Sequence, residues 1–264
     1  MSRTKLEILV TNDDGYTAKG INILARLLLK YGNVTVIAPE KTQSGMSAAL
    51  SLANKVRFYK VFEQEQAGNG LRVYALTGTP TDCVKMAMNS FFSIESKPDL
   101  LVSGINHGSN ASAASIYSGT LGAAAEGAVY GIPAVGLSLD THLEDPDFSH
   151  ITSYIERIIE QVIARPPRKG VYLNVNFPYL SKEKIRGFKF AKQGMGMWIK
   201  EFHNSIEKGE EELYYMTGEF VDTEESELGD HRVVEQGYIS VVPHNIDTTD
   251  YREKERLERE WKML

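Results

Sequence analysis

The sequence contains almost none of the features that mark secreted or membrane proteins. Cys83 is the only cysteine among 264 residues, which excludes an intrachain disulfide and a cysteine-ligated zinc cluster. No apolar run approaches the ~20 residues that a membrane-spanning helix requires. The first residues, MSRTKLEILV, lack the apolar segment and the small-residue cleavage site of a signal peptide. The sequence therefore predicts a soluble, cytoplasmic protein without a membrane partner.

Positive charge is also scarce. The chain has 29 Lys and Arg against 35 Asp and Glu, a net charge of −6, and no stripe of basic residues. Because proteins bind nucleic acid largely by neutralising its phosphates with cationic side chains, this composition argues against a duplex nucleic acid partner. A small phosphorylated substrate is still compatible with an acidic protein, provided that a bound cation offsets the local charge.

Several well-known catalytic and binding motifs are absent as well. There is no G-x-G-x-x-G after the first strand-like segment, which removes support for nicotinamide and flavin dinucleotides. A P-loop, an H-E-x-x-H metalloprotease helix and a G-x-S-x-G nucleophile elbow are also missing. Internal repeats and low-complexity segments are not found. These absences narrow the choice of function.

Alternation of short apolar runs with amphipathic segments fills the first half of the chain. This pattern is typical of a parallel sheet with crossover helices, and it predicts the α/β class. Thr79 and Pro80 have the chemistry of an N-cap and first helical residue. The expected strands are 6–10, 34–38, 100–103, 134–139 and 171–177, with a strand pair at 55–62 and 71–76. The expected helices are 18–31, closed by Gly32, one starting at 79, then 119–130 and 149–164.

The composition changes after Pro166-Pro167. Strands are expected at 185–191 and 237–242, and the charged stretch 210–220 predicts a projecting strand or hairpin arm. The segment 250–264 is expected to form a charged terminal helix. We divide the chain into a core, 1–180, and a smaller C-terminal part, 181–264, which is not expected to fold independently.

Polar residues gather directly after several of the expected strands. In parallel α/β sheets, ligands bind outside the carboxyl ends of the strands, so these segments should meet at one edge. The helix that follows the fourth cluster should point its positive end at the same edge. The four clusters are Asp13 and Asp14, then Ser44 and Gly45, then Asn106, His107 and Asn110, and finally Ser118, Gly119 and Thr120.

The oxygen-rich character of these clusters points to a hard metal ion. Two carboxylates, a hydroxyl and an amide suit Mg²⁺ or Mn²⁺ and are poor ligands for zinc or copper. The backbone N–H groups of 118–120 would form a cradle for phosphate. Two adjacent aspartates repel each other unless a cation lies nearby.

Each cluster also has a purely structural interpretation. An aspartate after a strand often serves as a turn former or helix cap, and Ser118 could simply cap a helix. Asn106 could be a left-handed turn residue, and His107 a neutral loop histidine. Cys83 lies within an expected helix and is interpreted as a small buried side chain.

The same segments resemble the SurE family of survival-protein nucleotidases. The similarity extends in order through most of the chain. It is carried by ILVTNDDGY (8–16), VIAPEKTQSGMS (36–47), GTPTDCV (78–84), PDLLVSGINHGSN (98–110), YSGTLGAAAEG (117–127), GIPAVGLSL (131–139), LNVNFP (173–178) and GYISVVPHNIDTTD (237–250).

This resemblance implies a Rossmann-like, three-layer core with a mostly parallel sheet and a C-terminal part that exchanges arms between subunits of a homodimer or homotetramer. It also implies metal-dependent hydrolysis of nucleoside 5′-monophosphates, with 3′-nucleotides and polyphosphate as further substrates and inorganic phosphate as a product. By position, one divalent ion per subunit would be held by Asp13, Asp14, Ser44 and Asn106, the first two being catalytic. The residues expected to contact substrate are Asn12, Gly45, Asn110, Ser118, Gly119 and Thr120.

Two departures from the family pattern lie near this expected site. Gln43 stands where many members have arginine, and Ala113-Ala114-Ser115 replaces a more acidic loop. Two rival functions are a phosphatase that uses an aspartate as nucleophile and a receiver-like, nucleotide-binding switch module. The first usually spaces its two aspartates by one residue, unlike the adjacent pair here. Sustained phosphate release would exclude the second.

Overall fold

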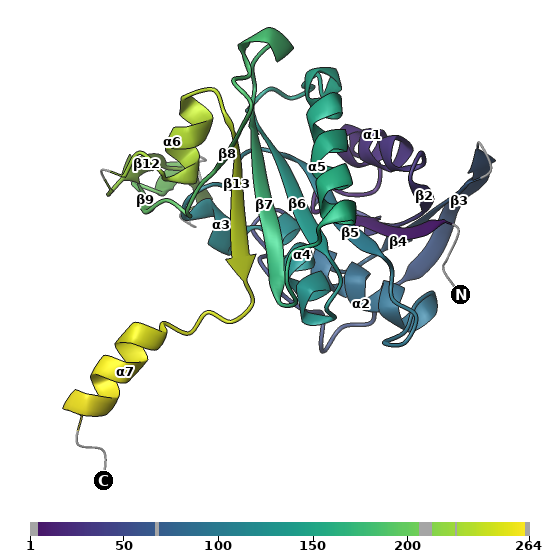
Figure 1. The fold of residues 1–264 in the computed structure, drawn as a ribbon, viewed down its shortest axis with the longest axis horizontal. Coiled ribbons are helices and arrows are strands. Elements are labelled where there is room, and N and C mark those ends of the chain that lie inside the picture. Colours follow the sequence, from purple (N-terminus) through teal and green to yellow (C-terminus); the bar gives the residue numbers. More distant parts are fainter. Residues whose placement is uncertain (1–4, 67–68, 206–212, 225, 262–264) are drawn as a thin grey trace.

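A nine-stranded sheet forms the centre of the molecule (Figure 1). The structure is a computed structural model that describes residues 5–66, 69–205, 213–224 and 226–261. The strand order is β3-β4-β2-β1-β5-β6-β7-β13-β8. The strands are β1 (Leu6–Thr11), β2 (Gly32–Pro39), β3 (Phe58–Gln66), β4 (Asn69–Leu76), β5 (Leu100–His107), β6 (Ala134–Asp140), β7 (Val171–Pro178), β8 (Phe188–Phe190) and β13 (Ile239–Asn245).

The strands from β4 to β7 in this order are parallel to one another. β3 pairs antiparallel with β4, and β13 pairs antiparallel with β7 and parallel with β8. The expected α/β class with a mostly parallel sheet is therefore confirmed. The strand pair predicted before Thr79 is also present, as β3 and β4.

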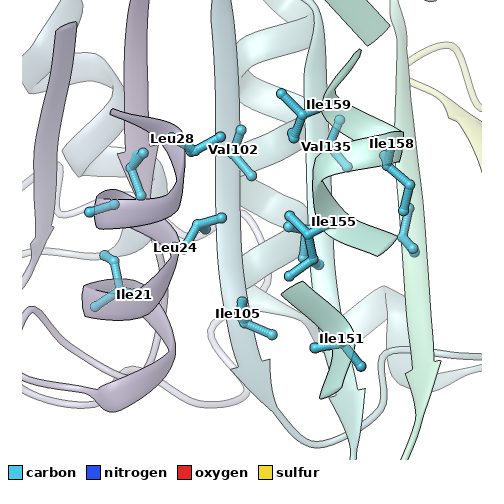
Figure 2. Close-up of a cluster of buried hydrophobic side chains, with 14 of the residues drawn as sticks. Ile21, Leu24, Leu28, Val102, Ile105, Val135, Ile151, Ile155, Ile158 and Ile159 are labelled. Atoms are coloured by element: carbon cyan, nitrogen blue, oxygen red, sulfur yellow. The ribbon is translucent and has the colours of Figure 1, made fainter. Parts of the chain in front are cut away.

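Helices cover both faces of the sheet and make three layers. On one face lie α1 (Lys19–Leu28) and α5 (Thr152–Ala164), which follows a 3₁₀ turn at Ser149–Ile151; on the other lie α2 (Pro80–Ser90) and α4 (Gly119–Val129). Figure 2 shows Leu24 of α1 and Ile155 of α5 beside Val102 and Val135 of the sheet. The remaining short helices are α3 (Ala114–Tyr117), α6 (Asp230–Glu235) and a 3₁₀ turn at Lys182–Lys184.

Burial on both faces explains why the strands are almost continuously apolar. In β1, Ile8 and Val10 belong to the core under α1 and α5, whereas Leu9 belongs to the core under α2 and α4. All three side chains are fully buried. Alternate residues of a strand point to opposite faces, so a strand covered on both sides needs apolar residues at every position.

The start of α2 follows the sequence prediction closely. Thr79 is the N-cap: its hydroxyl accepts from the Asp82 backbone N–H, and an Asp82 carboxylate oxygen accepts from Thr79 N. Pro80 occupies the first helical position. This reciprocal capping box satisfies two amides that a helix start otherwise leaves without partners.

Several element boundaries differ from the predictions. The first helix ends at Leu28, and Gly32, expected to close it, instead begins β2 opposite Leu6. The predicted strand 185–191 shortens to Phe188–Phe190, because only three of its residues pair with β13.

The C-terminal part both completes the sheet and projects from it. β9 (Gly196–Ile199) pairs antiparallel with β12 (Glu219–Asp222), and β10 (Phe202–Ser205) pairs antiparallel with β11 (Leu213–Met216). These four strands form the arm. Residues 210–212 of the predicted arm lie outside the described residues. α7 (Tyr251–Glu260) extends away from the body of the molecule (Figure 1).

Within the described ranges, every helix is too short or too polar to cross a lipid bilayer.

Candidate functional site

The predicted clusters meet at the carboxyl ends of β1, β2 and β5. The backbone N–H of Gln43, after β2, donates to the carbonyl of Asp13, after β1, at 2.7 Å. The N–H of His107, at the end of β5, donates to Asp14 Oδ2 at 3.1 Å. The hydroxyl of Thr120, in the first turn of α4, donates to Asp13 Oδ1. Three loops and one helix start are thus joined around the two aspartates.

The two adjacent carboxylates lie in an unfavourable environment for negative charge. Asp13 is only 4% exposed, and its burial raises its pKa to about 6, with the nearby Asp14 adding to the rise and Thr120 opposing it. Burial also raises the pKa of Asp14, against the hydrogen bond from His107 N. Buried carboxylates without a cation are costly, and a positive ion between them would reverse both effects.

Because of this burial, replacing Asp13 by Asn is expected to stabilise the metal-free protein at neutral pH. A carboxyl whose folded pKa lies above its unfolded value contributes stability below about pH 4 and loses it as the pH rises through 6. The stability gain of Asp13→Asn should therefore grow across this window and level off above pH 7, at on the order of 2–3 kcal/mol.

Urea unfolding of both proteins in chelator, at intervals from pH 4 to pH 7.5, measures this difference. Titrations of groups that do not interact with Asp13 cancel when the two curves are subtracted. A difference that stays constant over the whole range would contradict the assignment of a perturbed Asp13.

Asn106 and Ser44, the two other expected metal ligands, differ in how firmly they are held. Asn106 is 8% exposed, and its Nδ2 donates to the Gly108 carbonyl at 2.8 Å, which leaves Oδ1 as the atom with ligand capacity. Ser44 is exposed, and its hydroxyl lies 3.2 Å from Thr42 Oγ1. The Gln43 contact places the Ser44 loop against Asp13.

Of the residues expected to contact phosphate, three lie at the start of α4 and one, Gly45, lies in the loop after β2. Ser118 is the N-cap of α4, and its hydroxyl accepts from Leu121 N at 3.1 Å, so it does cap the helix as the structural interpretation proposed. The N–H groups at Gly119 and Thr120 begin this eleven-residue helix. Gly45 has φ +75°, a left-handed conformation that suits glycine, and it is exposed.

Gly119 is confined by Asp13 and Pro80. A Cβ at this position would lie 2.9 Å from the Asp13 Cβ and 3.2 Å from Asp13 Oδ2. Alanine is a better helix former than glycine, by about 1 kcal/mol. Gly119→Ala is therefore expected to keep the fold but to displace Asp13 and lower kcat at least about tenfold, because small misplacements of reacting groups are costly.

Gly127→Ala is the matched control, since it is the same substitution on the same helix. Its Cβ would meet Leu101 Cδ1 at 3.0 Å and the Ala134 Cβ at 3.3 Å, inside the core and away from the aspartates. Steady-state kinetics and thermal unfolding separate the two cases. Equal losses of kcat in both variants would contradict a specific effect on Asp13.

Asn110 and Asn12 are placed by contacts that sequence reasoning did not anticipate. Asn110 Nδ2 donates to Ser138 Oγ at 2.8 Å, and its backbone N–H donates to Asn176 Oδ1 at 2.8 Å. Asn174 Nδ2 in turn donates to the carbonyl of Asn110 at 2.9 Å. Asn12 Nδ2 donates to the Gly15 carbonyl at 3.0 Å. Both side chains therefore shape loops, and their contact with substrate stays a prediction.

The donor set fits a hard divalent cation. Among the described residues, no group of three or more His, Cys, Asp or Glu side chains is arranged to hold a metal ion. A cation at this edge would therefore depend on Asp13, Asp14, amide and hydroxyl oxygens and water. Mg²⁺ and Mn²⁺ accept that combination, and Mg²⁺ characteristically binds one or two carboxylates with several waters.

A cavity of about 670 Å³ opens beside the start of α4. Ser47, Ser115 and Ser118 line one part of it, and Lys192 and His244 line another. A larger cavity, of about 810 Å³, lies between α5 and the edge formed by β7, β13 and β8. Neither aspartate lines either cavity, but Ser118, the N-cap of α4, lines the smaller one, and the same helix start reaches Asp13 through Thr120.

Known proteins resemble this chain over nearly its whole length. A family model described as "Survival protein SurE" matches residues 8–200. The 5′-nucleotidase SurE of Phocaeicola vulgatus is 42% identical over 252 residues, 95% of each chain, and that of Caldanaerobacter subterraneus subsp. tengcongensis is 40% identical over 262 residues, 98% of each. The crystal structure of the SurE protein from Aquifex aeolicus has a TM-score of 0.78 at 31% identity, covering 96% of this chain and 98% of that one.

Proposed function

The chain belongs to the survival protein SurE family and is a 5′-nucleotidase, and from this premise we propose that it hydrolyses nucleoside 5′-monophosphates with one divalent cation, Mg²⁺ or Mn²⁺, per subunit. The observation that carries the proposal is the junction of Asp13 and Asp14 with the N-terminus of α4. A cation site and a helix N-terminus then lie on the same small area. Nucleoside and inorganic phosphate are the products.

Asp13, Asp14 and Asn106 would hold the cation, with Ser44 as a fourth ligand. The bound cation would supply Lewis-acid polarisation of the phosphoryl oxygens and a more acidic water. The N–H groups of Gly119 and Thr120, together with the positive end of the helix, stabilise the charge that develops on those oxygens. Water oxygen forms the new bond to phosphorus, the bond to the 5′-oxygen breaks, and that oxygen leaves protonated.

The cavity beside Ser118 offers room for the nucleoside. Its volume of about 670 Å³ falls in the usual range for sites that bind small molecules. Gln43 precedes Ser44, at a position where arginine would bind phosphate through two charge-assisted hydrogen bonds. Because glutamine is neutral, this chain depends more on the cation and on the N–H groups of α4 for phosphate binding. A site that grips mainly the phosphoryl group would also admit 3′-nucleotides and polyphosphate.

A phosphate-release panel tests the proposal. Nucleoside 5′- and 3′-monophosphates, polyphosphate and an aryl phosphate are each assayed with Mg²⁺ and with Mn²⁺, and Asp13→Asn prepared in parallel gives the background. Sustained release from 5′-monophosphates above this background is expected. Release no faster than that of the variant for every substrate and metal would overturn the proposal. A single burst of phosphate without turnover would favour a switch module.

We also propose that the arm pairs with another subunit to form a homodimer or homotetramer. The outer strands β10 and β11 present large apolar side chains to solvent, with Phe202 and Met216 each 66% exposed and Tyr215 55% exposed. A lone two-stranded ribbon has marginal stability in water, and clustered apolar side chains mark interaction surfaces. The free and buried Cys83 is in keeping with the reducing cytoplasm that we propose as the location.

Removing the outer ribbon is expected to yield a smaller assembly. Thr217 N donates to the Glu201 carbonyl at 2.8 Å, so residues 202–216 can be replaced by an Asn-Gly turn while β9 and β12 stay paired. Sedimentation of wild type and variant at equal concentrations measures the mass. An identical mass for both proteins would contradict assembly through the arm.

A further inference from the structure

One loop connects the two halves of the aspartate site. Residues 108–117 run from the end of β5, where His107 N reaches Asp14, to the N-cap of α4, whose first turn reaches Asp13. The loop is fixed near its start by Asn176, which accepts from Asn110 N, and at its end by Ser47, which bonds the carbonyls of Ile116 and Tyr117. The middle of the loop is held by a different residue.

That residue is Asp230, the first residue of α6. Its side chain is fully buried, and a single oxygen, Oδ1, accepts three backbone N–H groups from three places in the chain. Ser112 N in the loop lies at 2.9 Å, Gly194 N at 2.9 Å and His231 N at 3.0 Å. Ser112 has φ +55°, an uncommon conformation for serine, and it is 1% exposed.

The same carboxylate is tied to the base of the arm. Gly194 precedes β9 by two residues, and a Cβ there would lie 2.2 Å from His231 Nδ1, so only glycine fits this approach. His231 Nε2 lies 2.8 Å from Asp222 Oδ2 at the end of β12, and Arg232 Nε donates to that oxygen at 2.6 Å. Asp230 therefore contacts the segment just before β9 directly, and its neighbours His231 and Arg232 contact the end of β12. Figure 1 shows α6 beside these two strands.

We infer that Asp230 is a positioning residue that couples the base of the arm to the loop 108–117, and through it to the phosphate-binding start of α4. The inference rests on the proposed function, because it concerns how that site is held. An aspartate at a helix start is common and by itself indicates only a favourable dipole interaction. Here the carboxylate also accepts hydrogen bonds from the buried N–H groups of Ser112 and Gly194, both distant in sequence. A favourable dipole interaction would not require these two contacts.

Loss of the carboxylate should therefore loosen the loop. A buried N–H without a partner is destabilising, so the amides of Ser112 and Gly194 would move toward water. Substrate binding should suffer more than the chemical step, because Asp13 and Asp14 keep their own contacts. Asp230→Ala is expected to raise KM for a nucleoside 5′-monophosphate about tenfold, with a smaller fall in kcat. Asp230→Asn keeps a neutral acceptor and should restore KM to within about threefold of wild type.

Val233→Ala is the matched control. Val233 lies one turn along α6 and is fully buried, so its truncation weakens the same helix without removing the acceptor. Hydrogen exchange followed by mass spectrometry reads the loop directly and does not require turnover. Peptides that cover 108–117 and 193–195 should exchange faster in Asp230→Ala than in wild type, Val233→Ala or Asp230→Asn.

Unchanged exchange of the loop in Asp230→Ala would overturn the inference. Equal loosening and an equal rise of KM in Val233→Ala would overturn it too, because the effect would then follow from the stability of α6. If wild type released no phosphate from any nucleotide, the proposed function would fail, while the exchange data would still decide whether Asp230 holds the loop.

Discussion

Exhaustive removal of divalent metal ions is expected to abolish phosphate release, and Mg²⁺ or Mn²⁺ should restore it. The reason lies in the charge at the aspartate edge. Asp13 and Asp14 are adjacent, and burial disfavours the charge on both. A phosphate that approaches without a cation would meet two carboxylates, with only the helix amides of α4 in its favour. Cations supply several kcal/mol to phosphoryl transfer, so the rate should fall on the order of a thousandfold or more.

Dialysis against a chelator, followed by phosphate-release assays with single added metals, measures this effect. Far-ultraviolet circular dichroism and unfolding of the metal-free protein verify that the fold survives. Ca²⁺ serves as a control, because it binds oxygen ligands but prefers a larger and more flexible shell. Full activity after complete metal removal would contradict the proposed site, and activity restored only by Zn²⁺ would contradict its oxygen-ligand character.

The strands and helices of the core were predictable because two-sided burial leaves a strong trace in sequence. Leu9 alternates with Ile8 and Val10, and all three must be apolar when helices cover both faces. The edge at which the polar clusters meet was predictable for a topological reason, since parallel strands end on the same side. Thr79 and Pro80 show that a local cap can be read from a few residues.

The contacts that complete the site were not predictable in the same way. Thr120 was expected to contact phosphate through its backbone N–H, but the hydrogen bond from its hydroxyl to Asp13, 107 positions earlier, was not foreseen. Asp230 bonds Ser112 across 118 positions, and no local pattern links the two. Asn174 and Asn176 did leave a signal: two asparagines at alternate positions of a buried strand need partners, and the loop at Asn110 provides them.

Boundaries failed where pairing overrode local preference. Gly32 has the chemistry of a helix terminator, but a Cβ there would lie 2.1 Å from the Leu6 carbonyl oxygen, so the residue is glycine for the close approach of β1 and β2. The register of β10 and β11, the outer strands of the arm, could not be predicted for a different reason. Their side chains are largely exposed, and the sequence carries no inside-outside pattern that could fix their register.

Replacing either site aspartate by asparagine is expected to lower turnover by at least about a hundredfold, equivalent to about 3 kcal/mol or more of transition-state stabilisation. Asparagine preserves shape and can still accept from Thr120 or His107 N, so the fold should remain. What is lost is one of the two carboxylate charges that would hold the proposed cation. Asp13 is the more buried of the two and lies under Gly119, whereas Asp14 accepts from the end of β5.

Asp82→Asn is the matched control. Asp82 is a neighbouring carboxylate that caps α2 and accepts from Ser51 N at 3.2 Å, without contact to either site aspartate among the described residues. Its replacement should cost about 1 kcal/mol of stability and leave kcat within a few fold. Phosphate release at saturating Mg²⁺ or Mn²⁺ and unfolding in chelator are measured for all three variants.

The decisive result is that activity and metal-free stability should change in opposite directions. Asp13→Asn and Asp14→Asn should lose activity while the metal-free proteins become more stable, because each variant removes a charge that burial disfavours and that the hydrogen bond from Thr120 or His107 offsets only in part. Asp82→Asn should show the reverse, a loss of stability with activity retained. A purely structural pair of aspartates would give lower stability and near-normal rates. An aspartate that lowers the stability of the metal-free protein but is required for activity with metal has a catalytic or metal-binding role. Opposite changes in stability and activity therefore distinguish such aspartates from those that cap helices or form turns.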